Sequence, residues 1–92
     1  ISAELAPKLV RNERKVFDLS GAFRLRNKEL RKQWYPKSPS LPATTTYGLP
    51  EWNREDLSTA NLVACAGCYP TAAILALKPL VKSGLLADKA EI

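Results

Sequence analysis

The sequence predicts an α/β fold in which helices flank a parallel sheet. Two apolar segments, 15–20 (KVFDLS) and 61–66 (NLVACA), are short and rich in residues that favour strands. Segments of helical composition lie before, between and after them, and strands that alternate with helices are typical of a parallel sheet. The content of 46% hydrophobic and 25% charged residues is ordinary for a globular protein.

The predicted elements run along the chain in the order helix, strand, helix, long loop, helix, strand and helix: 2–10, 15–20, 27–35, 36–50, 53–60, 61–66 and 70–84. In the first helix, Leu5, Leu9 and Val10 share one face, although Pro7 fits poorly outside a first helical turn. The polar turn RNER follows. Asp18 lies near the end of the first strand, and the loop GAFRL follows Ser20.

The later elements are placed by their capping residues and helix breakers. Asn27 and Asn53 can cap the second and third helices. Between these helices, PKSPSLPATTTYGLP holds four of the seven prolines and is predicted to be a loop, and long ordered loops are usually functional. In the last helix, Pro70 suits the first helical position and Gly84 the C-terminal stop. The run KAEI at 89–92 is expected to begin another strand.

The composition limits the classes of function. No apolar run approaches the roughly 20 residues of a membrane span, so no membrane segment is predicted. Two cysteines are too few for a disulfide scaffold, which favours a reducing compartment such as the cytoplasm.

The net charge is +5, and much of the excess lies in residues 8–37. Such a stretch is typical of a solvated helix face, of a nucleic-acid surface or of a site for one anionic small ligand. The nearby aromatic residues Trp34 and Tyr35 are adjacent rather than interleaved with the charges. We therefore expect no nucleic-acid partner.

Histidine is absent, which bears on any cysteine chemistry. Histidine is the commonest general base and the commonest zinc partner of cysteine. Either the acid–base group lies elsewhere, or the chain is incomplete. Because the chain opens within a predicted helix and closes at the start of a predicted strand, we expect it to be a segment of a larger α/β protein.

The segment CAGCYPT, residues 65–71, carries the candidate chemistry. A thioredoxin-like redox pair would place its first cysteine at a helix N-terminus, but Cys65 falls inside the predicted strand. A zinc site needs further Cys or His ligands that the sequence lacks, so no metal is predicted. Two interpretations of Cys68 then remain, a nucleophile or an inert buried thiol.

The position of Cys68 fits a nucleophile. Gly67 permits a sharp turn out of the strand, and Cys68 then stands just before the helix. Backbone N–H groups and the helix dipole favour an anion at that point, and the thiolate is the nucleophilic form. The same N–H groups could stabilise an oxyanion formed by attack on a carbonyl.

Three segments, in this order, resemble the N-acetyl-γ-glutamyl-phosphate reductases, a family of semialdehyde dehydrogenases: VFDLSGAFRL (16–25), TYGLPEWNRED (46–56) and GCYPTAAILALKPL (67–80). The resemblance implies part of a Rossmann-like parallel sheet with flanking helices, running into the start of a catalytic domain. Residues 1–66 would then be the second half of an NAD(P)-binding domain. Residues 67–92 would be the active-site cysteine turn, the following helix and the start of the catalytic and dimerisation domain.

The resemblance also implies a function. Members of this family use NADPH to reduce N-acetyl-glutamyl 5-phosphate to the 5-semialdehyde in arginine biosynthesis, releasing phosphate through a cysteine thioester. It implies that Cys68 is the nucleophile, that Arg24 binds the substrate phosphate, and that Ser20 contacts the cofactor. The expected substrate is a small acyl phosphate, the cofactor is NADPH, and the full-length enzyme is expected to be a cytoplasmic homo-oligomer.

Other interpretations stay open. A relative could act on an aminoadipyl or aspartyl phosphate. A non-catalytic α/β module could use the C-x-x-C pair for redox chemistry or bind a partner through its basic face. Arg24 could instead form a surface ion pair with Asp18.

The chain also departs from the family pattern. Many members have Asn-Pro-Gly-Cys where this chain has Cys-Ala-Gly-Cys, and the thiol of Cys65 is a weak hydrogen-bonding group. The family's G-x-G-x-x-G turn and its acid–base histidine are expected outside this chain. On its own, the chain is therefore not expected to bind NADPH well or to turn over.

Overall fold

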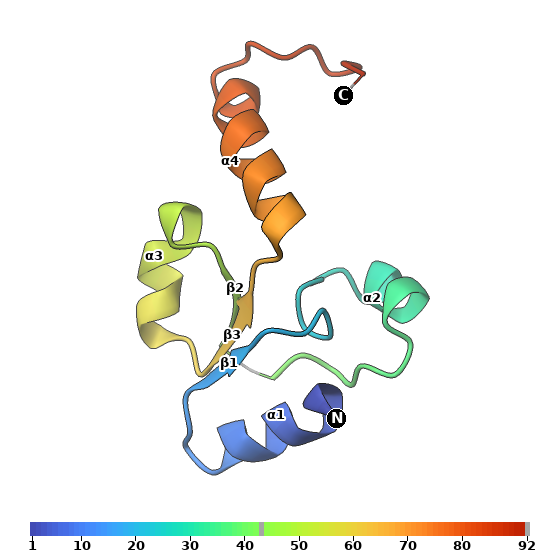
Figure 1. Cartoon of the computed structure of the whole chain (residues 1–92), viewed down its shortest axis with the longest axis vertical. Coiled ribbons are helices and arrows are strands. Elements are labelled where there is room, and N and C mark those ends of the chain that lie inside the picture. Colours follow the sequence, from blue (N-terminus) through green and yellow to red (C-terminus); the bar gives the residue numbers. More distant parts are fainter. Residues whose placement is uncertain (43, 92) are drawn as a thin grey trace.

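The computed structural model describes residues 1–42 and 44–91. Helices surround a three-stranded sheet, which confirms the predicted α/β class (Figure 1). The elements are α1 (Ser2–Arg11), β1 (Val16–Asp18), α2 (Lys28–Trp34), β2 (Thr45–Gly48), α3 (Pro50–Thr59), β3 (Leu62–Cys65) and α4 (Cys68–Lys82).

The sheet has the strand order β1-β3-β2, and β3 pairs in parallel with both neighbours. The ladder with β1 ends at the pair Asp18–Ala64, whereas the ladder with β2 continues to Gly48–Cys65. Because all three strands are parallel, their carboxyl ends meet at one edge of the sheet, the edge at which α/β proteins bind ligands.

The core lies between the sheet and α1. Leu62 and Ala64 of β3 are completely buried and share a cluster with Ala6 of α1 and with Phe23, which is 2% exposed. Residues two apart on a strand face the same way, so one face of β3 points toward this cluster. Phe23 anchors the loop that follows β1, and that loop carries Arg24.

The strand β2 corrects the prediction of a structureless loop over 36–50. Thr45–Gly48 pairs with β3 along its whole length, and Thr46 is buried. The sequence TTTYG contains β-branched and aromatic residues that favour strands. The prolines on both sides, Pro42 and Pro50, masked this signal because they are typical of loops.

Helix α3 begins at Pro50, three residues earlier than predicted, with the proline in its first turn. The predicted cap, Asn53, instead lies within the helix at a break with φ −127°. Its side-chain Nδ2 donates to the Tyr47 carbonyl at 3.0 Å, so Asn53 ties the helix to the end of β2. By contrast, Asn27 caps α2 as predicted, because its side chain accepts from the N–H groups of Glu29 and Leu30.

Helix α4 begins at Cys68, so the predicted start at Pro70 was two residues late. At the other end, Gly84 has φ +73°, as a C-terminal stop requires. The N–H of Gly84 donates to Val81, and the N–H of Leu85 donates to Leu80, which is the Schellman pattern.

The remaining boundaries differ from the predictions by less. Both predicted strands are longer than the observed ones. The structure has β1 at Val16–Asp18 in place of 15–20, and β3 at Leu62–Cys65 in place of 61–66. The strand start expected at 89–92 does not appear in residues 89–91, and Ile92 lies outside the described residues.

Helix α4 extends away from the sheet (Figure 1). None of its residues is buried, and Val81 is 61% exposed. Its contact with α3 is made by two cations over one ring: Lys78 Nζ lies 4.6 Å, and Lys82 Nζ 5.7 Å, from the centroid of Trp52. Within 1–42 and 44–91, no helix is both long and apolar enough to cross a membrane.

Candidate functional site

Cys68 is the first residue of α4 and is exposed to solvent. Gly67, at φ −79° and ψ 161°, is the N-cap, and its carbonyl accepts from the Thr71 N–H at 3.0 Å. The first N–H groups of a helix have no partner within that helix, and Cys68 belongs to this first turn. The position combines an accessible sulfur with the positive end of a helix dipole.

Cys65 lies in a different setting from Cys68. It is the last residue of β3 and is half-buried, and its Sγ lies 3.8 Å from the carbonyl oxygen of Val63 in the same strand. Both thiols are free. Of the two, only Cys68 stands at the helix N-terminus.

Arg24 reaches from the loop after β1 to the turn that precedes Cys68. Its Nε donates to the Cys65 carbonyl at 2.8 Å, and its Nη2 donates to the Leu19 carbonyl at 3.0 Å. A β-carbon placed on Gly67 would lie 3.0 Å from Arg24 Nη1. The guanidinium therefore lies directly against the turn and contacts carbonyls rather than forming the ion pair with Asp18 considered from the sequence.

Ser20 shapes the chain where it leaves β1. Its Oγ donates to Asp18 Oδ2 at 2.9 Å, and its N–H donates to Oδ1 of the same carboxylate at 3.0 Å. The Ser20 Oγ also accepts from the Ala22 N–H at 3.3 Å. Asp18 is 5% exposed, so this carboxylate holds the loop from inside the protein.

A cavity of about 560 Å³ opens beside Ser20, between the start of α1 and the end of α2. Gly21 belongs to its wall, and a β-carbon there would lie 2.6 Å from Cζ of Tyr35, so the tyrosine ring lies directly against this glycine. Ligand pockets usually measure about 300–1,000 Å³. Its lining mixes serines, an aromatic ring and a cation: Ser2, Ser20, Ser38, Trp34 and Lys37 among others.

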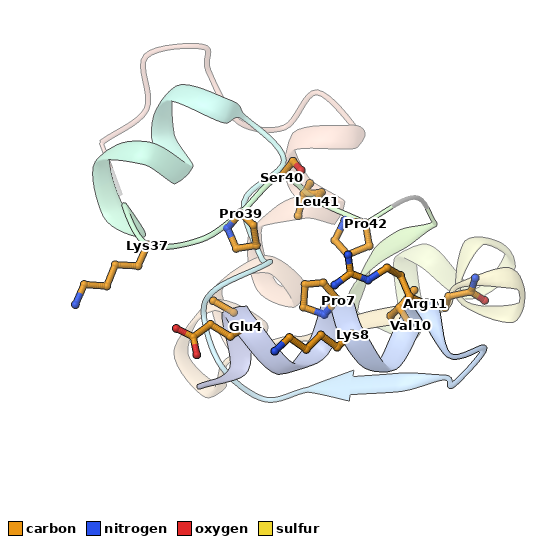
Figure 2. Close-up of a pocket in the computed structure, with 12 residues that line it drawn as sticks. Glu4, Pro7, Lys8, Val10, Arg11, Lys37, Pro39, Ser40, Leu41 and Pro42 are labelled. Atoms are coloured by element: carbon orange, nitrogen blue, oxygen red, sulfur yellow. The ribbon is translucent and has the colours of Figure 1, made fainter.

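A larger cavity, of about 710 Å³, lies elsewhere, between α1 and the segment 37–42 (Figure 2). Pro7 and Arg11 of α1 face Pro42 across it, whereas Lys37 extends away from the other lining side chains (Figure 2). It includes Asn61, which precedes β3, so it lies toward the amino end of that strand. None of the candidate site residues lines it.

The sequence did not indicate Gly48, the last residue of β2. Its carbonyl accepts from the Ala66 N–H at 3.4 Å, and a β-carbon on it would lie 3.0 Å from the Cys65 Cα. Recognising TTTYG as a strand would have placed Gly48 beside the cysteine turn. Among residues 1–42 and 44–91, no group of three or more His, Cys, Asp or Glu side chains is arranged to hold a metal ion.

Comparison with known proteins gives one family match. Residues 1–60 match the family described as "Semialdehyde dehydrogenase, NAD binding domain". The match covers α1, the sheet strands β1 and β2, and the loop with Ser20 and Arg24.

Similar curated proteins share one description, "N-acetyl-gamma-glutamyl-phosphate reductase". The protein from Salmonella typhi is 48% identical over 89 residues, which are 94% of this chain and 27% of that protein. The protein from Brevibacillus brevis is 49% identical over 87 residues, covering 91% of this chain and 25% of that protein. The one from Crocosphaera subtropica is 42% identical over 95 aligned positions, which cover 100% of this chain and 27% of that protein. The chain thus spans about a quarter of the length of these relatives.

Proposed function

Because this chain belongs to the semialdehyde dehydrogenases, through the NAD-binding domain that its residues 1–60 match, we propose that the whole protein is a reductase of N-acetyl-γ-glutamyl 5-phosphate. The product is the 5-semialdehyde, phosphate is released, and the reaction belongs to arginine biosynthesis. The name that the similar proteins share, N-acetyl-gamma-glutamyl-phosphate reductase, supports this substrate. The observation that carries the chemistry is the exposed Cys68 thiol at the N-terminus of α4.

In this proposal Cys68 is the nucleophile. Its thiolate attacks the acyl carbon, the bond from that carbon to the phosphate oxygen breaks, and inorganic phosphate leaves with the electron pair. The substrate is then held on Cys68 as a thioester. N–H groups at the start of α4 are suited to stabilise the negative oxygen of the tetrahedral intermediate, because they have no helical partner.

Arg24 is proposed to bind the substrate phosphate. A guanidinium has five N–H donors in a fixed fork, and it suits the geometry of phosphate. Two of these donors go to the carbonyls of Cys65 and Leu19 among the described residues, which leaves Nη1 beside Gly67 as the donor nearest the cysteine turn.

A nicotinamide cofactor follows from the family, and we propose that it is NADPH. When bound, it supplies the hydride that reduces the thioester to the aldehyde. The cavity beside Ser20, of about 560 Å³, borders the carboxyl end of β1, and its lining includes the polar side chains of Ser20 and Lys37. Ser20 and the start of α1 would hold the cofactor there, while the Asp18 carboxylate keeps Ser20 in position.

The finer features of the whole protein are also proposals. Residues 1–66 form the second half of the nicotinamide-binding domain, and residues 67–92 lead into the catalytic and dimerisation domain. We expect a homo-oligomer in the cytoplasm, with a small-molecule substrate and no nucleic-acid partner.

The assignment of Cys68 is tested in the whole protein with matched cysteine variants. Cys68→Ser should lower kcat for N-acetyl-glutamyl phosphate by at least about 10³-fold, since serine is a far weaker nucleophile without an activating base. Cys65→Ser should retain most activity, and iodoacetamide should label Cys68 before Cys65. Equal inactivation by both variants, or first labelling of Cys65, would show that the nucleophile is assigned wrongly.

The same preparation tests substrate and cofactor. The proposal predicts higher kcat/KM with the N-acetyl-glutamyl phosphate than with the aminoadipyl or aspartyl analogue, and with NADPH than with NADH. A preference for the aminoadipyl phosphate would contradict the proposed substrate and assign the protein to the related reductases that act on that acyl phosphate. A Cys65–Cys68 disulfide that cycles without any acyl-phosphate reduction would favour the redox module instead.

A further inference from the structure

The peptide that links Cys65 to Ala66 is held from both sides. Its N–H donates to the Gly48 carbonyl of β2 at 3.4 Å, and its carbonyl accepts from Arg24 Nε at 2.8 Å. The pairing of β1 with β3 ends at Ala64, one residue before the pairing of β2 with β3 ends. On the β1 side, the arginine side chain therefore satisfies a carbonyl that has run past the end of the ladder.

Arg24 is itself anchored. Its backbone N–H donates to the Gly21 carbonyl at 3.2 Å, and its Nη2 donates to the Leu19 carbonyl at 3.0 Å. The preceding side chain, Phe23, is 2% exposed in the core. The guanidinium thus connects two fixed points, the loop after β1 and the end of β3.

Gly67 completes this contact. A β-carbon there would lie 3.0 Å from Arg24 Nη1, closer than side-chain carbons ordinarily approach a neighbour. The Gly67 carbonyl accepts the Thr71 N–H at 3.0 Å, at the start of α4. Only Ala66 and Gly67 separate the clamped Cys65 carbonyl from Cys68, so the clamp limits where the Cys68 backbone can lie.

We propose that Arg24 is a positioning residue for Cys68. By holding the Cys65 carbonyl, its guanidinium fixes the turn that presents the thiol to the substrate carbonyl. The consequence for catalysis rests on the proposed function, but the clamp does not. The clamp uses Nε and Nη2, so it is separate from phosphate binding through Nη1. It also acts on a backbone carbonyl, so it does not depend on the side chain at position 65.

Hydrogen exchange in the whole protein tests the clamp without any need for activity. Arg24→Lys keeps the charge but loses the fixed fork of donors. The amides of Ala66 and Thr71, which flank the turn, should exchange about tenfold faster or more, as expected for the loss of hydrogen bonds from a charged group. The matched control is Arg26→Lys, because Arg26 Nη2 donates to the Thr45 carbonyl at 3.4 Å, away from the turn.

The two outcomes are distinct. Faster exchange at both amides in Arg24→Lys, with no change in Arg26→Lys, supports the clamp. Unchanged exchange in Arg24→Lys overturns it, and so does an equal increase in the control.

Steady-state kinetics give a second readout. A positioning role predicts that Arg24→Lys lowers kcat about 100-fold, the effect of a displacement of about 1 Å at the reacting group. KM for the acyl phosphate should rise as well, because Arg24 is also proposed to bind the substrate phosphate, so the fall in kcat together with the faster exchange is the readout specific to positioning. A raised KM with unchanged kcat and unchanged exchange would reduce Arg24 to a phosphate ligand and overturn the proposal. If the unmodified protein reduces no acyl phosphate, the proposed function fails, while the exchange measurement still decides the role of Arg24.

Discussion

At the scale of single residues, Ser20 has a structural task whatever else it contacts. It donates both its N–H and its hydroxyl to the buried Asp18 carboxylate, and its oxygen accepts the Ala22 N–H. These bonds set the path of the loop between β1 and Arg24. A variant at Ser20 will therefore change stability as well as any cofactor contact, and the two effects have to be separated.

We predict that Asp18→Ala lowers the free energy of unfolding by about 1–3 kcal/mol, because it leaves the donors of Ser20 without their acceptor. Ser20→Ala should cost less, about 0.5–1.5 kcal/mol, since the Asp18 carboxylate keeps the backbone N–H of residue 20. Denaturant unfolding followed by circular dichroism measures both. An effect of Ser20→Ala larger than that of Asp18→Ala would contradict this order.

A cofactor role would add a second effect to Ser20→Ala. After correction for stability, the affinity of the whole protein for NADPH should fall in this variant. Ala22→Gly, which keeps the backbone N–H that donates to Ser20, serves as the neighbouring control. If the affinity for NADPH is unchanged in Ser20→Ala, Ser20 only stabilises the loop and does not contact the cofactor.

At the scale of elements, α2 depends on its cap. The helix has seven residues, so few internal hydrogen bonds support it, and short helices are marginal in water. The Asn27 side chain accepts from the N–H of Glu29 at 2.9 Å and from that of Leu30 at 3.0 Å. Buried Arg31 adds support from within the helix, since its Nη1 donates to the Leu25 carbonyl at 3.0 Å.

Asn27→Ala should lower the free energy of unfolding by about 1 kcal/mol, the usual cost of losing an N-cap. Asn27→Asp should cost little, because its carboxylate can accept the same two N–H groups and suits the helix dipole. Thermal unfolding compares the two variants. If both cost the same, the cap contributes nothing to α2.

The elements also show which parts of this fold can be predicted from the sequence. Asn27, Gly84 and the apolar strand before Cys68 are local signals, because cap, stop and strand each depend on a few adjacent residues. The sequence does not predict strand β2, because its neighbouring prolines are typical of a loop. The segment is a strand because it pairs with β3, which is distant in the sequence. Asn53 was misassigned for a similar reason, since its partner is the Tyr47 carbonyl of that same strand.

The candidate site divides in the same way. The sequence is enough to set Cys68 at a strand-to-helix turn and to single out Arg24 through its resemblance to a known segment. The hydrogen bond from Arg24 to the Cys65 carbonyl could not be predicted, because it joins a side chain to a backbone atom 41 residues away. A contact of that kind leaves no pattern in the residue types.

At the scale of the whole molecule, burial is concentrated around β3. Leu62 is 0% exposed, whereas Leu80 of α4 is 39% exposed. We predict that Leu62→Ala lowers the free energy of unfolding of the 92-residue chain by about 2–5 kcal/mol, the range for cavities in well-packed cores. The same substitution at Leu80 should cost less than about 0.5 kcal/mol, as for a surface position.

Equilibrium unfolding in denaturant, followed by circular dichroism, measures both leucine variants. The denaturant concentration at the unfolding midpoint should fall in Leu62→Ala and stay nearly unchanged in Leu80→Ala. Comparable costs would mean that α4 packs against the body of the chain, contrary to its open position (Figure 1).

The central place of β3 has a consequence for synthesis. Among the strands of the described residues, β1 and β2 each pair with β3 and not with each other, and β3 comes last in the chain. On the ribosome, the earlier strands have no partner within this segment until residues 62–65 emerge. Pairing across such long separations is slow. The Cys65 carbonyl and the Cys68 thiol therefore reach their final positions only when β3 pairs with β1 and β2. A nascent chain has no ordered cysteine turn until this sheet has formed.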